Sequence, residues 1–309
     1  MPRSRSPADA GRRAFLRRSA AAAAALALPR ALPASPSMQT RPHPRTGEPI
    51  PVVGLGTWQT FDVGGGETER APLREVLRRL FAAGGRVIDS SPMYGRAEAV
   101  VGDLLRGTPE HGRAFVATKV WTSGKAEGQA QMRESERRMG GRIDLLQVHN
   151  LVDWRTQLAT LRAWKAEGRI RHVGITHHAL GAMGDLERIV REEGVDFVQL
   201  PYSAAVRQAE ARLLPACRDR GAAVLVMRPF EQGELLRRLR GKPLPAAAAE
   251  AGAASWAQLL LQFILSHPAV TCVIPATAKP EHMDDDARAG SLPPLGEAQR
   301  KALLRAVDA

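Results

Sequence analysis

Short apolar runs alternate with longer amphipathic stretches along most of this chain, from Val52 to about Ala289. In the first amphipathic stretch, Arg70–Ala83, leucine and valine recur at steps of three and four residues, the spacing of a helix with one buried face. Eight strands that are each followed by a helix predict an α/β fold, a single (β/α)8 TIM barrel within residues 39–309. The eight expected strands are Val52–Gly56, Val87–Asp89, Phe115–Val120, Ile143–His149, Arg171–Thr176, Phe197–Leu200, Val224–Met227 and Cys272–Ile274.

The segment ahead of these strands predicts an additional small element. Residues 39–56 alternate polar and apolar side chains around Arg45–Glu48, which indicates an N-terminal β-hairpin. The same order of elements could instead form a doubly wound sheet, which needs a glycine-rich phosphate loop between an early strand and its helix. Gly54–Gly56 lacks the third glycine and the following helix, so the barrel is favoured.

Residues 1–34 are predicted to be a targeting segment. Residues 12–17 read RRAFLR, which resembles the twin-arginine (Tat) export motif. The alanine-rich run Ala20–Leu28 is too short and too weakly apolar to cross a bilayer of about 30 Å. We therefore expect a Tat signal peptide, export through the Tat translocase, a periplasmic or extracytoplasmic location and no stable membrane insertion. A disordered tail rich in arginine and alanine is the alternative.

The formal net charge of +12 invites a nucleic-acid partner, but the distribution of the charge argues against one. Residues 1–34 hold seven arginines and one aspartate, so the rest of the chain carries +6. No later stretch interleaves aromatic and basic residues, and we expect an anionic small ligand and no nucleic acid. The two cysteines, Cys217 and Cys272, lie in a predicted helix and a predicted strand, and no zinc spacing occurs. They predict buried thiols and no metal.

Polar side chains end three consecutive strands of the predicted barrel. Asp89 ends the second strand, Lys119 lies near the end of the third, and His149 ends the fourth. Tyr94 lies in the loop after the second strand. In a barrel these positions meet at one mouth. Each residue alone could have a structural role, but the four together favour an active site.

This set of side chains suits the reduction of a carbonyl. Tyrosine has an ordinary pKa of about 10, and a nearby lysine cation would lower that pKa. An aspartate would keep the lysine charged, and a histidine would donate a second hydrogen bond to the carbonyl. The tyrosine could then protonate the carbonyl oxygen. No side chain can supply the electrons, so a hydride-carrying cofactor is implied.

Motifs over residues 39–290 resemble, in order, those of the aldo-keto reductase superfamily. They read GLGTW at 54–58, IDSSPMYG at 88–95, TK at 118–119, DLLQVH at 144–149, VGIT at 173–176, VQ at 198–199 and VIP at 273–275. The resemblance implies a barrel that binds NADPH and passes hydride to an aldehyde or ketone. It implies that Tyr94 is the general acid, that Lys119 and Asp89 tune it, and that His149 orients the carbonyl.

The resemblance also implies which residues surround the ligands. The substrate pocket would include Trp58, Trp121 and Asn150. Where the family's NADPH enzymes often place a lysine and an arginine on the 2′-phosphate, this chain has Ala276 and His282, so NADH stays possible beside NADPH. The implied cofactor-binding residues are Gly56, Thr57, Trp58, Asp89, Thr176, His177, Gln199, Met227, Arg228, Pro229, Phe230, Pro275, Thr277, Lys279 and His282.

The sequence therefore predicts a monomeric, NAD(P)H-dependent reductase of small aldehydes or ketones. The alternative is a redox sensor that binds the nicotinamide cofactor on the same barrel with slow or no catalysis, because a fold alone does not establish a reaction.

Overall fold

The computed structural model describes residues 37–309, and the predicted targeting segment lies outside the described residues. Strand β1 (Thr40–Pro42) pairs antiparallel with β2 (Pro49–Pro51), which confirms the expected hairpin. Gly47 in its turn has a φ of 72°, a left-handed conformation that suits glycine. Ile50 is fully buried against side chains from the first residues of the barrel strands. The hairpin therefore closes the N-terminal end of the barrel.

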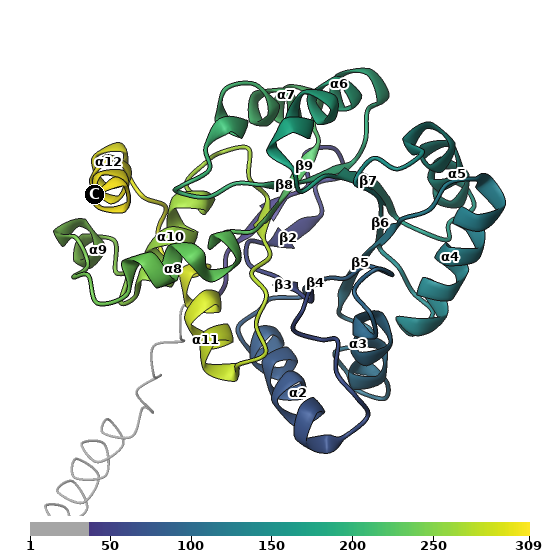
Figure 1. Cartoon of the computed structure of the whole chain (residues 1–309), viewed down its shortest axis with the longest axis horizontal. Helices are drawn as coiled ribbons and strands as arrows, with labels where there is room; N and C mark the ends of the chain where they lie inside the picture. The colour runs from purple at the N-terminus through teal and green to yellow at the C-terminus, as the bar shows by residue number, and fades with distance from the viewer. Residues whose placement is uncertain (1–36) are drawn as a thin grey trace, which may run out of the picture. The chain divides into compact units, whose positions relative to one another are not determined.

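The central sheet has eight parallel strands whose neighbours follow chain order. Bridges from Val53 to Val273 and from Gly56 to Ala276 join the first strand to the last, so the sheet closes into the predicted (β/α)8 barrel (Figure 1). The carboxyl ends of all eight strands consequently face one side. The strands are β3 (Leu55–Gly56), β4 (Val87–Asp89), β5 (Phe115–Val120), β6 (Leu145–His149), β7 (His172–Thr176), β8 (Phe197–Pro201), β9 (Ala223–Met227) and β10 (Cys272–Val273).

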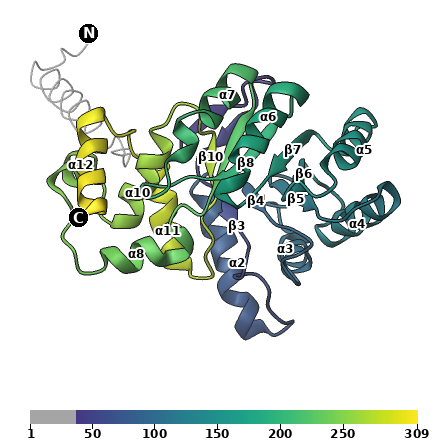
Figure 2. The same cartoon turned by 45° about the horizontal axis from the view of Figure 1, so that its top comes forward.

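Helices surround the sheet, and Figure 2 shows α8, α10, α11 and α12 gathered on one side of it. Among residues 37–309, no helix has the length and apolar character of a membrane span. The helices are α2 (Glu67–Ala82), α3 (Ala97–Leu105), α4 (Lys125–Arg138), α5 (Trp154–Ala166), α6 (Met183–Glu193), α7 (Leu213–Arg220), α8 (Glu234–Leu239), α9 (Ala246–Glu250), α10 (Trp256–Leu265), α11 (Pro280–Ala289) and α12 (Glu297–Asp308), with short 3-10 turns η2 (Leu180–Ala182), η3 (Gln208–Glu210) and η4 (Glu231–Gly233).

The sequence predicts helices over Gln129–Met139 and Gln208–Arg220, and the structure differs from both for local reasons. Helix α4 starts at Lys125, four residues before the apolar pattern predicts, because the amide of Gln157 on α5 binds the carbonyls of Thr122 and Gly124 and fixes the loop ahead of it. The helix expected over 208–220 is divided into η3 and α7. Pro215 lies in the first turn of α7 and has no backbone N–H to donate to a carbonyl of the preceding turn. A continuous helix from Gln208 would lack that hydrogen bond, so α7 starts separately at Leu213.

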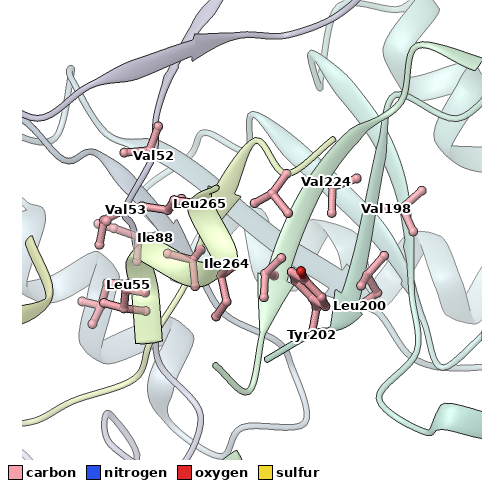
Figure 3. Packing of buried hydrophobic residues seen from close by; sticks show 14 of the residues in the cluster. Val52, Val53, Leu55, Ile88, Val198, Leu200, Tyr202, Val224, Ile264 and Leu265 are labelled. Atoms are coloured by element: carbon pink, nitrogen blue, oxygen red, sulfur yellow. The ribbon is translucent and has the colours of Figure 1, made fainter. Parts of the chain in front are cut away.

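Two apolar cores hold the barrel together. One lies inside the sheet and includes Phe115, Leu145 and Phe197. The larger one lies between the sheet and the helices, and Figure 3 shows strand residues such as Ile88 in one cluster with Ile264 of α10. Both cysteines are buried and free, as the sequence predicts. Strand side chains are therefore packed on both faces, which fixes the strand ends that carry the site.

Candidate active site

Four ionisable side chains meet at the carboxyl ends of β4, β5 and β6. Asp89 and His149 are the last residues of their strands, Lys119 is the fifth residue of β5, and Tyr94 lies in the turn before α3. Asp89, Tyr94 and His149 line a cavity of about 860 Å³, a volume suited to a small-molecule or cofactor site. The four residues that the sequence places at neighbouring strand ends therefore lie together in the structure.

Lys119 and Asp89 form a buried ion pair. Lys119 Nζ lies 2.6 Å from Asp89 Oδ2 and 2.6 Å from the carbonyl oxygen of Ser90, and the lysine side chain has no exposed surface. Burial of the amine is the largest single effect and opposes its charge, but the Asp89 carboxylate and the Tyr94 hydroxyl together outweigh it and raise the pKa of Lys119 above its ordinary value. The lysine therefore stays cationic next to the cavity.

The other oxygen of Asp89 is held by two glutamine amides. Asp89 Oδ1 accepts from Gln147 Nε2 at 3.0 Å and from Gln199 Nε2 at 2.8 Å, and Gln199 Oε1 accepts from Thr176 Oγ1 at 3.2 Å. A Cβ at Gly174 would lie 2.9 Å from Gln147 Cγ, so glycine leaves room for this amide. These contacts fix the carboxylate that orients the lysine.

Tyr94 is the half-buried acid of the group. The Lys119 ammonium lies 4.9 Å from the centre of the Tyr94 ring. Burial raises the pKa of the Tyr94 phenol above its ordinary value, and Lys119 opposes that rise without cancelling it. The sequence predicts a lowered pKa for Tyr94, but the net shift of its pKa is upward because desolvation outweighs the effect of the lysine. Tyr94 is consequently protonated at neutral pH, with a cation nearby to stabilise its phenolate.

His149 is a neutral hydrogen-bonding group. Burial, the Lys119 cation and His178 and His177 lower its pKa to about 2. Its ring is perpendicular to that of Tyr94, with ring centres 6.0 Å apart, and its Nδ1 lies 3.0 Å from Ser91 Oγ. Ser91 did not emerge from the sequence, because this contact joins residues 58 positions apart. The imidazole can donate or accept one hydrogen bond on the cavity side but carries no charge at pH 7.

Most residues that the sequence assigns to cofactor or substrate line this cavity. His178 also lines it and lies 3.1 Å from Asn150 Oδ1 through its Nδ1, one position beyond the predicted His177. The predicted residues on the wall are Gly56, Thr57, Trp58, Asp89, Asn150, Gln199, Met227, Arg228, Pro229, Phe230, Pro275, Thr277 and His282. Wall residues that the sequence argument missed include Met93, Gln59, Gln232, Ser255, Trp256, Asp285 and Asp286.

Four predicted ligand-binding residues are placed elsewhere than on the cavity wall. Thr176 is buried and turned to Gln199, and His177 accepts a hydrogen bond from the amide of Ala179 at 3.0 Å. Lys279 is exposed at the start of α11. Trp121 is 42% exposed, with its ring centre 6.4 Å from that of His149. Position at or after a strand end predicts only that a residue lies near the mouth of the barrel. Local contacts with side chains and backbone decide whether its side chain reaches the cavity.

A second polar cluster lies near the start of the strands, among His43, His172 and Asp196, whose ligand-type atoms lie within 4.8 Å of one another. His43 Nε2 faces the Asp196 carbonyl at 3.1 Å, and the Asp196 carboxylate accepts from Lys165 Nζ at 2.6 Å and from the Val173 amide at 2.8 Å. These partners occupy most of the atoms that a metal would need. We assign the cluster to the structure of the hairpin and barrel base.

The groups on the cavity wall fit a nicotinamide dinucleotide. Arg228 has no carboxylate partner within residues 37–309 and can face a phosphate. Asp286 is 4% exposed and has no hydrogen-bond partner in the described part of the chain, and burial together with Asp285 raises its pKa well above the ordinary value. This shift favours the protonated carboxyl, which offers one donor and one acceptor. Such uncommitted groups are expected where a phosphate-bearing heterocyclic ligand binds.

The closed barrel, the tyrosine beside a buried lysine–aspartate pair and the neutral histidine define the class of the protein, an NAD(P)H-dependent oxidoreductase. Residues 52–307 match the model of the aldo/keto reductase family, and the chain belongs to that family. The family shown by this match is the one that the sequence motifs resemble.

Known proteins similar to this chain agree with the assignment. The NADH-specific methylglyoxal reductase of Escherichia coli strain K12 is 27% identical over 234 residues, which cover 63% of this chain and 68% of the relative. An aldo-keto reductase of Mycobacterium sp. strain JLS is 28% identical over 253 residues, covering 78% and 83% of the two chains. A solved aldo/keto reductase of Klebsiella pneumoniae, in complex with NADP and acetate, is 28% identical with a TM-score of 0.70 and covers 87% of this chain and 94% of that one.

Proposed function

We propose that the protein reduces aldehyde or ketone carbonyls to alcohols, with NAD(P)H as the hydride source and Tyr94 as the proton donor. The observation that carries this proposal is the position of Tyr94. Its phenol stands in the cavity, protonated at neutral pH, with the Lys119 ammonium 4.9 Å from its ring centre and the neutral His149 ring opposite. A proton donor, a cation that stabilises its phenolate and a neutral hydrogen-bonding imidazole thus lie around one site.

Each side chain has a separate role in this proposal. A bound nicotinamide would supply a hydride to the carbonyl carbon, and the electron pair of the C=O π bond would move onto oxygen. Tyr94 gives its hydroxyl proton to that oxygen, which completes the alcohol. Lys119 stabilises the phenolate that Tyr94 leaves, and Asp89 keeps the lysine charged and aimed. Proton transfer from water then restores Tyr94.

His149 would orient the substrate. A neutral imidazole N–H on the cavity side can donate to the carbonyl oxygen and position it for the proton of Tyr94. A histidinium there would compete with Tyr94 as the acid, but burial holds the pKa of His149 at about 2 and excludes that role at pH 7. The two side chains therefore have distinct tasks.

An isotope-transfer experiment tests whether hydride passes from the cofactor to a carbonyl. The protein is incubated with NADPH or NADH deuterated at C4 of the nicotinamide and with a panel of aldehydes that includes methylglyoxal, the substrate in the name of the E. coli relative. Deuterium on the carbinol carbon of the product, detected by mass spectrometry, is the expected result. Cofactor binding by fluorescence titration without transfer to any carbonyl would favour the redox sensor instead.

We also propose that residues 1–34 direct folded protein to the Tat translocase and that the enzyme acts outside the cytoplasm. The support is the sequence RRAFLR at 12–17 and the short alanine-rich run after it. Cell fractionation tests this with Arg12→Lys/Arg13→Lys as the variant. Accumulation of the variant, but not of the natural chain, in the cytoplasm is expected. Equal distribution of the two would contradict export through this motif.

A further inference from the structure

We propose that Ser91 is a positioning residue that sets the tautomer of His149, so that Nε2 carries the ring proton and presents it to the substrate. This inference rests on the proposed function, in which His149 donates to the carbonyl oxygen. Ser91 Oγ lies 3.0 Å from His149 Nδ1, and Ser91 is fully buried. Ser91 does not line the cavity, so its hydroxyl reaches the reaction only through the imidazole.

The tautomer matters because the ring is neutral. A neutral imidazole has one N–H, and the hydrogen bond made by one nitrogen decides whether the other carries the proton. Within residues 37–309, Nδ1 of His149 has Ser91 as its partner, whereas Nε2 has no protein partner and His149 lines the cavity. With the proton on Nε2 the ring can donate to a carbonyl oxygen. With the proton on Nδ1 it presents a lone pair that would repel the same oxygen.

The surroundings of Ser91 decide the direction of its hydrogen bond. The backbone amide of Met93 already donates toward Ser91 Oγ from 3.4 Å. If His149 Nδ1 also donated to this oxygen, the serine hydroxyl hydrogen would have no acceptor among the described residues, at a position with no exposed surface. Buried donors are nearly always paired. The hydroxyl therefore donates to Nδ1, and the ring proton lies on Nε2.

The backbone couples this serine to the catalytic tyrosine. The carbonyl oxygen of Ser91 accepts from the amide of Tyr94 at 3.0 Å, and the amide of the preceding Ser90 donates to the Ala117 carbonyl of β5 at 2.9 Å. One turn, hydrogen-bonded to β5, thus positions both Tyr94 and the Ser91 hydroxyl, which sets the tautomer of His149. Ser91 therefore links Tyr94 and His149, the two groups that would both bind the carbonyl oxygen of the substrate.

Nuclear magnetic resonance of the full chain reads the tautomer directly. Uniform ¹⁵N-labelling of histidine gives signals from eight residues, and His149→Gln identifies those of His149. In the cofactor-free protein at pH 7, we expect an unprotonated Nδ1 and a protonated Nε2. In Ser91→Ala we expect both His149 nitrogen shifts to move toward values shared by the two tautomers. A protonated Nδ1 in the natural chain, or unchanged shifts in Ser91→Ala, would overturn the inference.

The adjacent serine supplies a matched control. Ser90 is equally buried, but its hydroxyl oxygen accepts a hydrogen bond from Thr57 Oγ1 at 3.0 Å and makes none with His149. Ser90→Ala should therefore leave the tautomer signature unchanged. A shift of the His149 signals as large as in Ser91→Ala would mean that general loosening of the turn is responsible, and it would overturn a specific role for Ser91.

Kinetics supply an independent readout. Loss of one buried hydrogen bond to the orienting group should lower kcat for carbonyl reduction about tenfold in Ser91→Ala, with the cofactor Kd unchanged. Ser91→Thr keeps a hydroxyl and should restore most of the tautomer signature and rate. An unchanged kcat in Ser91→Ala would contradict the inference. Because the resonance measurement needs no turnover, failure of the proposed reaction and failure of the tautomer assignment remain distinguishable.

Discussion

The ammonium of Lys119 lies 2.6 Å from Asp89 Oδ2 at a position from which water is excluded. Two glutamine amides hold the second carboxylate oxygen, so the aspartate cannot turn away from the lysine. The pair therefore provides a fixed positive charge beside Tyr94. A buried pair of this kind contributes little net stability compared with apolar replacements, but removal of one partner is costly. In the proposed function, the pair serves to stabilise the phenolate of Tyr94.

Replacing Lys119, alone and together with Asp89, should separate the effect of the ion pair on stability from its effect on kcat. Lys119→Met leaves Asp89 buried without its cation, which should lower the free energy of unfolding by about 3 kcal/mol. The loss of the cation should lower kcat by about 100-fold. In the double variant Lys119→Met/Asp89→Asn the buried charge is gone, so urea unfolding should recover while kcat stays low. Recovery of kcat together with stability would contradict a catalytic role for the pair.

The raised pKa of Tyr94 predicts opposite pH dependences for the two directions of the reaction. Reduction needs the protonated phenol, which persists to pH values above the ordinary pKa of about 10. Oxidation of an alcohol needs the phenolate, so its kcat/KM should rise about tenfold per pH unit between pH 7 and 9. Steady-state rates with saturating cofactor measure both. A loss of reduction between pH 7 and 8 would argue against Tyr94 as the acid.

Buried histidines should make the fold sensitive to mild acid. The pKa of His149 is about 2 in the folded protein but about 6.5 in an unfolded chain, so below pH 6.5 the unfolded chain binds the extra proton. Stability should therefore fall as the pH drops from 6.5 to 5, by about 1.4 kcal/mol per pH unit for this residue. Urea unfolding at several pH values should give a shallower slope for His149→Gln. Equal slopes would contradict a neutral buried ring.

Cofactor preference should respond to the cavity residues near α11. His282 lines the cavity and Ala276 accompanies it, at the positions where the family resemblance implies contacts with a 2′-phosphate. Ala276→Lys/His282→Arg should raise the affinity ratio of NADPH to NADH at least tenfold through charge-assisted hydrogen bonds. Lys279→Ala should leave the ratio unchanged, because Lys279 is exposed away from the cavity wall. A drop in the ratio for Lys279→Ala would restore that residue to the cofactor site.

The strand ends that carry Asp89, Lys119 and His149 were predictable from the sequence. Apolar runs of strand length end at these residues or one residue beyond, and the barrel topology brings all strand ends to one side. The contacts that support them were not predictable in the same way. Gln199 lines the cavity, as expected of a cofactor-binding residue, but its amide also donates to Asp89 from a strand that is not a neighbour of β4, and no pattern along the chain marks that contact.

Residues outside the strands were harder to place. Ser91 meets His149 only because the turn after β4 folds over the end of β6, and no short-range pattern marks that contact. Lys279 follows a strand end, but it precedes Pro280 at the start of α11, and its amide binds Thr277 Oγ1 while the side chain stays exposed. The direction of a loop side chain depends on such local bonds, which a strand-end rule does not include.

In the proposed function the hydroxyl of Tyr94 supplies the proton, and the chain offers a matched pair of tyrosines to test this role. It has two tyrosines, and the hydroxyl of Tyr202 contacts Glu210 away from the cavity wall. We would measure kcat and cofactor Kd for Tyr94→Phe and Tyr202→Phe. We expect Tyr94→Phe to keep cofactor binding but to lower kcat at least 100-fold, whereas Tyr202→Phe should leave both cofactor binding and kcat unchanged. Comparable kcat values for the two variants would contradict this role.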